Sequence, residues 1–241
     1  MKKICIIICL IIAVLIGGMA IYLGDYYHAS DRAEVIMASG ETISKRVTVF
    51  RPTDLPSKEE SLSGLIFYPG GKVEVSAYAP LMKAFADQGI LCVLLEMPGN
   101  LAVLDRDAAD GILEMFPEVE NWYIGGHSLG GAMASAYAEE QEDEFEGLVL
   151  LASYSTKDVS DSGFGVISIY GSEDQVLNRD KYLEYKGNLP EETVEMVIQG
   201  GNHAYFGDYG LQEGDGEASI TCEEQIQVTA VEVTRWINAR E

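Results

Sequence analysis

The chain has 241 residues, enough for one large domain with a sizeable hydrophobic core. Its 39 acidic residues outweigh 16 basic ones and give a formal net charge of −23, which argues against nucleic acid and anionic lipid headgroups as partners. Two of the four cysteines lie in the N-terminal apolar run, and the other two, Cys92 and Cys222, are too few for a disulfide framework, although a single bridge between them remains an open alternative.

The N-terminus begins with an uninterrupted apolar run, residues 4–23, preceded by Lys2 and Lys3 and followed by Asp25. About 20 residues at about 1.5 Å each match the thickness of a bilayer core, which predicts a membrane anchor. The flanking charges favour a single pass that leaves the remaining domain outside the cell membrane. A cleaved signal peptide is the alternative, with small residues at Gly18 and Ala20 as the cleavage site, and it predicts a secreted protein.

The next segment, residues 24–42, is predicted as a polar stalk with one short helix at 31–38, and the folded domain is predicted at 43–241. Alternating residues predict an edge strand at 43–50. Continuous apolar runs predict buried strands at 62–68, 90–95, 121–124, 145–152, 166–170 and 193–198. Helical spacing predicts helices at 78–85, 105–116 and 132–138, and a last helix whose capping box is Thr221 and Glu224 and whose buried face is Ile226, Val233, Trp236 and Ile237.

This alternation of apolar strands and amphipathic helices defines the fold class. It predicts an α/β domain with a mostly parallel central sheet and helices on both faces. Few residues separate the strand that ends at Ala152 from the strand that begins at Val166. Because a cap domain does not fit into that connection, we expect an open site covered only by short loops.

The stretch Gly126-x-Ser128-x-Gly130 is the most informative motif of the chain. It matches the nucleophile-elbow pattern, in which a serine lies on a sharp turn between a strand and a helix. An apolar strand precedes it and a helix-forming run follows it, which is the context that the pattern requires. Glycine at the flanking positions avoids collisions of a side chain with the neighbouring chain. Ser128 is therefore predicted to be a nucleophile.

A serine nucleophile needs a base, and the chain contains three histidines. His28 lies in the predicted stalk, and His127 lies beside the serine with its side chain expected to point elsewhere. His203 remains, on a glycine-rich loop after the last predicted strand. We therefore expect His203 to be the general base.

The base needs an acid that orients it, and this acid is expected after a strand end between the serine and the histidine. Asp174 follows the strand at 166–170 and is the preferred residue, with Glu173 as the alternative. Asp158 and Asp161 follow the preceding strand and fit less well. The chain order Ser128, Asp174, His203 is the order in which the triad residues follow such an elbow.

The tetrahedral intermediate of such a reaction needs two N–H donors for its oxyanion. The first predicted donor is the backbone N–H of Leu129, at the start of the helix after the nucleophile. The second is expected from the loop Pro69-Gly70-Gly71-Lys72, with Gly71 preferred and Lys72 next.

With these motifs the chain resembles the α/β-hydrolase superfamily, and in particular its small, lidless, dienelactone-hydrolase-like members. The resemblance covers about residue 62 to the C-terminus and depends on the segments 67–73, 97–102, 125–131, 169–174 and 200–207. Dienelactone hydrolases use a cysteine nucleophile, so their substrate does not transfer to a chain with Ser128. The resemblance implies a serine hydrolase without a metal or other cofactor.

The first functional hypothesis is an exported carboxylic-ester hydrolase that acts on a small-molecule ester. An acyltransferase with a cell-envelope acceptor uses the same triad and is one alternative. A non-catalytic surface binding protein on the same fold is the other. The segment 207–216, rich in glycine and aspartate, lacks the spacing of a calcium loop and is expected to flank the active site.

Overall fold

The computed structural model describes residues 2–53 and 61–240, which contain one eight-stranded sheet. In sheet order the strands are β1 (Glu41–Ser44), β2 (Val47–Phe50), β4 (Leu91–Leu95), β3 (Ser63–Tyr68), β5 (Asn121–His127), β6 (Gly147–Leu151), β7 (Gly165–Gly171) and β8 (Val194–Ile198). All neighbours from β4 to β8 are parallel, and β1 and β2 are antiparallel additions at one edge. This arrangement confirms the predicted fold class.

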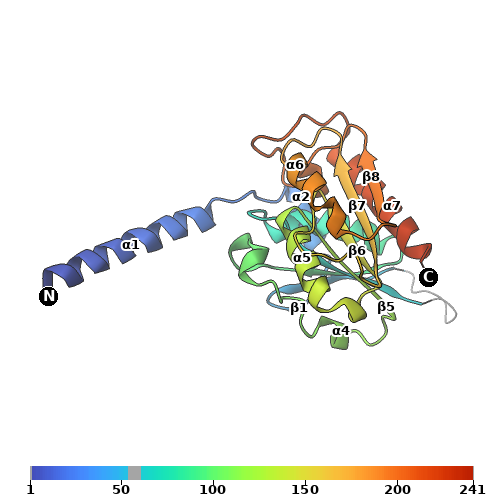
Figure 1. Ribbon diagram of the computed structural model, residues 1–241, viewed down its shortest axis with the longest axis horizontal. Coiled ribbons are helices and arrows are strands. Elements are labelled where there is room, and N and C mark those ends of the chain that lie inside the picture. Colours follow the sequence, from blue (N-terminus) through green and yellow to red (C-terminus); the bar gives the residue numbers. More distant parts are fainter. Residues whose placement is uncertain (1, 54–60, 241) are drawn as a thin grey trace.

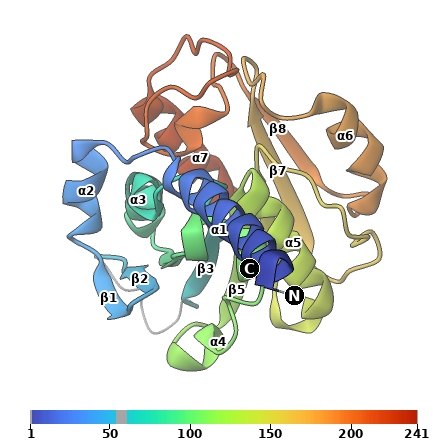
Figure 2. The same ribbon diagram turned by 90° about the vertical axis from the view of Figure 1, so that its left-hand side faces the viewer.

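Helices cover both faces of this sheet (Figure 2). They are α2 (Asp31–Met37), α3 (Ala79–Ala86), α4 (Ile112–Met115), α5 (Leu129–Glu140), α6 (Arg179–Glu184) and α7 (Cys222–Asn238). The 3₁₀ turns η1 (Val75–Tyr78), η2 (Pro98–Asn100), η3 (Ala102–Leu104), η4 (Glu142–Glu144), η5 (Tyr185–Asn188) and η6 (Ala204–Phe206) connect them. Both bonds of the predicted capping box at Thr221 and Glu224 are present, and the predicted face of α7 is buried.

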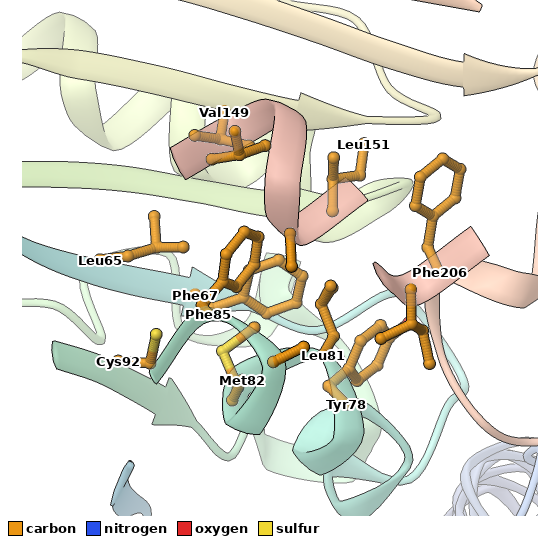
Figure 3. Close-up of a cluster of buried hydrophobic side chains, with 14 of the residues drawn as sticks. Leu65, Phe67, Tyr78, Leu81, Met82, Phe85, Cys92, Val149, Leu151 and Phe206 are labelled. Atoms are coloured by element: carbon orange, nitrogen blue, oxygen red, sulfur yellow. The ribbon is translucent and has the colours of Figure 1, made fainter. Parts of the chain in front are cut away.

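The two faces of the sheet bury alternate residues of each strand. In β3, Leu65 and Phe67 pack against α3 and α7, whereas Ile66 and Tyr68 pack on the face covered by α5. All four side chains are fully buried. Figure 3 shows part of the first of these clusters, in which Phe67 of β3 lies beside Phe85 of α3. Burial on both faces explains why β3 is a continuous apolar run in the sequence.

No helix or strand occurs in the connection between β6 and β7, residues 152–164, all of which the structure describes. The space that a cap domain would occupy in this position is therefore left to loops, as the short connection predicted. The carboxyl ends of β5, β7 and β8 meet at the same edge of the sheet.

Two predicted elements differ from the structure. Residues 43–50 form parts of a hairpin, β1 and β2, rather than one strand, because the chain turns at Lys45 and Arg46 while the alternation of residues continues in both arms. The helix predicted at 105–116 is reduced to α4. Its apolar residues are buried at helical spacing, but Gly111 has a φ of 73°, which ends any helix at that residue.

The predicted stalk, residues 24–42, is also corrected, because it packs on the domain. Ala33 of α2 is fully buried, and Tyr27 forms a parallel bridge with Val73. The Tyr27 N–H donates to the Lys72 carbonyl at 2.8 Å, and the Glu74 N–H donates to the Tyr27 carbonyl at 2.9 Å. The polar composition of the segment concealed these backbone bonds, which involve no particular side chain.

The N-terminal apolar run is helical, α1 (Lys2–Gly24), and projects away from the sheet (Figure 1). Several of its side chains lie outside the described residues. Within the described residues, none of the helices has both the length and the hydropathy needed to span a membrane. Cys92 and Cys222 are both free, so they do not form the bridge considered above.

Candidate active site

Ser128 lies on the sharp turn between β5 and α5, as the motif predicted. Its φ of 52° and ψ of −120° are strained for a residue with a side chain. Its N–H donates to the Leu151 carbonyl at 2.9 Å, and its own carbonyl accepts from the Ser153 hydroxyl at 2.7 Å. Leu151, at the end of neighbouring β6, and Ser153, two residues beyond it, therefore hold the strained backbone in place.

The two glycines of the motif are required by close backbone approach. A Cβ on Gly126 would lie 2.6 Å from the Tyr68 carbonyl oxygen, and one on Gly130 would collide with the Tyr68 and Pro69 carbonyl oxygens. The elbow is therefore pressed against the end of β3 and the loop that follows it. Only glycine at both positions permits that packing.

Asp174 follows β7 and His203 follows β8, and the structure brings these two residues together. His203 Nδ1 lies 2.9 Å from Asp174 Oδ2, and the two side chains are only 2% and 0% exposed. The other carboxylate oxygen of Asp174, Oδ1, accepts the N–H groups of Val176 and Leu177 at 2.9 and 2.8 Å. Because a carboxylate only accepts, Nδ1 of His203 donates and Nε2 is left as the acceptor.

The alternative acids lie elsewhere. Glu173 is exposed and accepts from the neighbouring Ser172 hydroxyl at 2.9 Å. Asp158 is exposed and bonds the Ser160 N–H and hydroxyl, and Asp161 is exposed as well. Of the four carboxylates considered, Asp174 is the one that contacts His203.

His127 contributes more than the sequence suggested, because its ring lies against the His203 ring with centroids 4.6 Å apart. Burial raises the pKa of the Tyr78 hydroxyl, which stays protonated and donates to Nδ1 of His127 at 2.8 Å. The same hydroxyl accepts the Gly70 N–H at 3.0 Å. Burial, and then the neighbouring His203, lowers the pKa of His127 well below its ordinary value, so His127 is neutral.

The three backbone N–H groups of residues 70–72 differ in their hydrogen bonds. The Gly70 N–H is used by Tyr78, and the Lys72 N–H donates to the Asn100 carbonyl at 2.7 Å. The hydrogen bonds of the described residues include none from the Gly71 N–H. A Cβ on Gly71 would lie 2.8 Å from Leu129 Cδ2, so Gly71 faces the start of α5. The Leu129 N–H has no partner within its helix because it belongs to the first residue. The geometry thus favours Gly71 and Leu129 as the expected oxyanion donors, because the Lys72 N–H is already bonded to the Asn100 carbonyl.

A cavity of about 370 Å³ opens at Ser128 and His203. Most of its lining is apolar, and its other lining residues are Leu129, Ala132, Met133, Ala152, Ser153, Tyr154, Thr156, Val176, Leu177 and Asn178. Its volume is at the lower end of the range of about 300–1,000 Å³ for ligand pockets. Among the described residues, histidine, cysteine, aspartate and glutamate form no group of three or more that could hold a metal ion.

Comparison with known proteins gives a family match over most of the domain. The family described as alpha/beta hydrolase matches residues 64–227, which is more than half of the chain. No curated protein sequence matches the chain.

Several solved structures share its fold at low sequence identity. Est1E from Butyrivibrio proteoclasticus has a TM-score of 0.60 and 12% identity, with 83% of this chain and 97% of that chain covered. MGS-MChE2, an alpha/beta hydrolase enzyme from a sediment metagenome of the Mar Chica lagoon in Morocco, has a TM-score of 0.58 and 14% identity, with 83% and 98% covered. A predicted CIB-like hydrolase from Thermoplasma acidophilum has a TM-score of 0.57 and 15% identity, with 81% and 97% covered.

Proposed function

The chain belongs to the alpha/beta hydrolase family, and from that premise we propose that it is a serine hydrolase that cleaves small carboxylic esters. The observation that carries the proposal is the buried pair of Asp174 and His203, whose histidine lines the same cavity as the strained Ser128. A nucleophile, a base and an acid that orients the base are the three parts that acyl transfer to a serine requires.

In the proposed reaction, Ser128 Oγ attacks the ester carbonyl carbon and its proton passes to Nε2 of His203. The bond from His203 Nδ1 to Asp174 fixes the tautomer in which Nε2 can accept that proton. The negative charge on the former carbonyl oxygen is stabilised by the Leu129 and Gly71 N–H groups. The alcohol leaves with the proton from His203, and a water molecule, activated by the same imidazole, then releases the acid from the acyl-enzyme.

The size of the cavity supports a substrate class. A cavity of about 370 Å³ with an apolar lining accommodates a short, uncharged acyl or alkyl group. A long chain would leave the cavity and gain little burial, at about 25 cal/mol per Å² of apolar surface. We therefore propose that short-chain esters are hydrolysed with a higher kcat/KM than long-chain esters.

The location of the enzyme is a further part of the proposal. Lys2 and Lys3 before the apolar run support export of the domain, either on an anchor or after cleavage of a signal peptide. Protease treatment of intact cells, followed by detection of the domain in the membrane, medium and cell fractions, tests this. A domain that is protected inside intact cells would exclude export.

The proposed function is tested by Ser128→Ala with a fluorophosphonate probe and p-nitrophenyl esters. We expect the wild-type protein to be labelled once, at Ser128, and Ser128→Ala to lose both labelling and hydrolysis. Ser135→Ala is the matched control, because Ser135 is a buried serine of α5, the helix that follows Ser128, where it donates to the Ala132 carbonyl and lies outside the cavity. Labelling at another serine, unchanged in Ser128→Ala, would refute the assignment.

A further inference from the structure

The segment 207–216 follows the proposed base, and its two aspartates take different partners. Asp208 forms an ion pair with Arg32 at 2.8 Å. Asp215 is half-buried and instead accepts backbone N–H groups. Within this segment, the Asp215 carboxylate therefore binds backbone N–H groups rather than a basic side chain.

The Asp215 carboxylate connects the two loops that carry the acid and the base. Its Oδ2 accepts the Ala204 N–H at 2.9 Å, and its Oδ1 accepts the Gln175 N–H at 3.2 Å. Ala204 follows His203 in the chain, and Gln175 follows Asp174. Two bonds from one carboxylate thus join the backbone next to both members of the pair.

Backbone packing at Gly216 strengthens this connection. The Gly216 N–H donates to Asp215 Oδ1 at 2.8 Å, and the Gly216 carbonyl accepts from Asn202 Nδ2 at 3.0 Å. A Cβ on Gly216 would collide with the Glu173 carbonyl oxygen. Residues 215 and 216 therefore lie between Glu173, which precedes Asp174, and Asn202, which precedes His203.

We propose that Asp215 is a positioning residue, which sets the distance and angle between Asp174 and His203 through the backbone of both loops. The proposal rests on the proposed function of that pair. Asp215 does not line the cavity at Ser128, so it acts through the imidazole rather than on the substrate. Displacement of a reacting group by about 1 Å can cost on the order of 100-fold in rate, which gives such a tether a measurable effect.

The substitution Asp215→Asn tests the tether with almost no change in shape. An asparagine keeps one acceptor oxygen and presents an NH₂ donor to the other backbone N–H, so one of the two loops is released. We expect kcat for p-nitrophenyl acetate and the rate of fluorophosphonate labelling to fall together by about 10- to 100-fold, with KM within about twofold of wild type. Asp208→Asn, in the same segment, is the matched control and should keep the wild-type kcat.

A double substitution separates positioning from a general structural role. In a His203→Ala background there is no imidazole to position, so adding Asp215→Asn should leave the small residual rate unchanged. In the variants that keep His203, titration of Ser128 with the probe counts the reactive sites and kcat is expressed per site, whereas the two His203→Ala variants are compared at equal concentrations of folded protein. A further loss in the double variant, an insoluble Asp215→Asn, or a kcat within twofold of wild type would each overturn the proposal. A wild-type protein without labelling at Ser128 would instead overturn the proposed function and this inference together.

Discussion

Ser128 and its proposed oxyanion donor Leu129 are neighbours in the chain, whereas Asp174 and His203 come from loops after two different strands. The first half of the site is shaped by backbone packing, with Gly126 and Gly130 pressed against the end of β3. The second half is assembled by side-chain hydrogen bonds, of which the Asp174–His203 and Asp215–Gln175 bonds span 29 and 40 residues of sequence. The two halves should consequently respond to different kinds of substitution.

The second half of the site, Asp174 and His203, should show the largest loss of activity when a side chain is removed. His203→Ala deletes the proposed base, and we expect kcat to fall by about 10⁴- to 10⁶-fold, with Asp174→Asn nearer the lower value. The fold should survive, because β8 and η6 keep their backbone bonds. Thermal unfolding and p-nitrophenyl ester kinetics measure the two effects. A kcat loss of less than about 100-fold in His203→Ala would mean that another group acts as the base.

The elbow, in contrast, should be most sensitive to substitutions that disturb its backbone packing. Gly130→Ala adds one methyl group that collides with two carbonyl oxygens, so we expect a loss of about 1–3 kcal/mol of stability or more, together with lost labelling of Ser128. Gly163→Ala is the matched control, because a Cβ there meets nothing within 4 Å. Urea unfolding of both variants provides the measurement. Equal stability of the two would show that the elbow is not tightly packed.

Gly71→Ala probes the contact between Gly71 and Leu129, the two proposed oxyanion donors. Its Cβ would lie 2.8 Å from the Leu129 side chain, which can move, so the fold should persist while the Gly71 N–H shifts. We expect kcat to fall about 10-fold with little change in KM, a smaller loss than removal of a donor, which costs about 10²- to 10³-fold. Lys72→Ala is the control, because its N–H remains bonded to Asn100. Wild-type kcat in Gly71→Ala would remove Gly71 from the proposed mechanism.

The difference between the two halves of the site also explains how much of it could be predicted from the sequence. Ser128 was found from five residues because an elbow needs glycines at fixed spacing. His203 was found because only one suitable histidine remained, and Asp174 because parallel strands end at one edge of the sheet. These three roles stay predictions until the proposed experiments are done.

Other features had no comparable sequence signal. Asp215 is one acidic residue among 39, and its partners are backbone N–H groups that any sequence supplies. The contact of Tyr27 with the loop at 72–74 is also made by the backbone. The spacing of apolar residues at 105–116 favoured a longer helix than the one that forms, and Gly111 interrupts it. The spacing alone could not reveal this, because residues buried at helical spacing also occur in turns.

The smallest effect that we predict concerns the pH dependence of stability, and it comes from His127, which lies between the two halves. Its pKa is lowered in the folded protein by burial and by His203, while Tyr78 donates to its Nδ1. Below the ordinary histidine pKa of about 6.5, the unfolded chain binds a proton that the native protein does not. The free energy of unfolding therefore falls with decreasing pH, from about pH 6.5 down to the lowered native pKa, by up to about 1.4 kcal/mol per pH unit from this group.

His127→Asn keeps an acceptor for Tyr78 and should remove this one-proton slope from urea unfolding measured between about pH 7 and 5. His28→Asn, at a histidine whose side chain is 70% exposed, should leave the slope in place. The same slope in wild type and His127→Asn would show that His127 is protonated in the native protein, and that the elbow and the acid–base pair do not meet at a neutral imidazole.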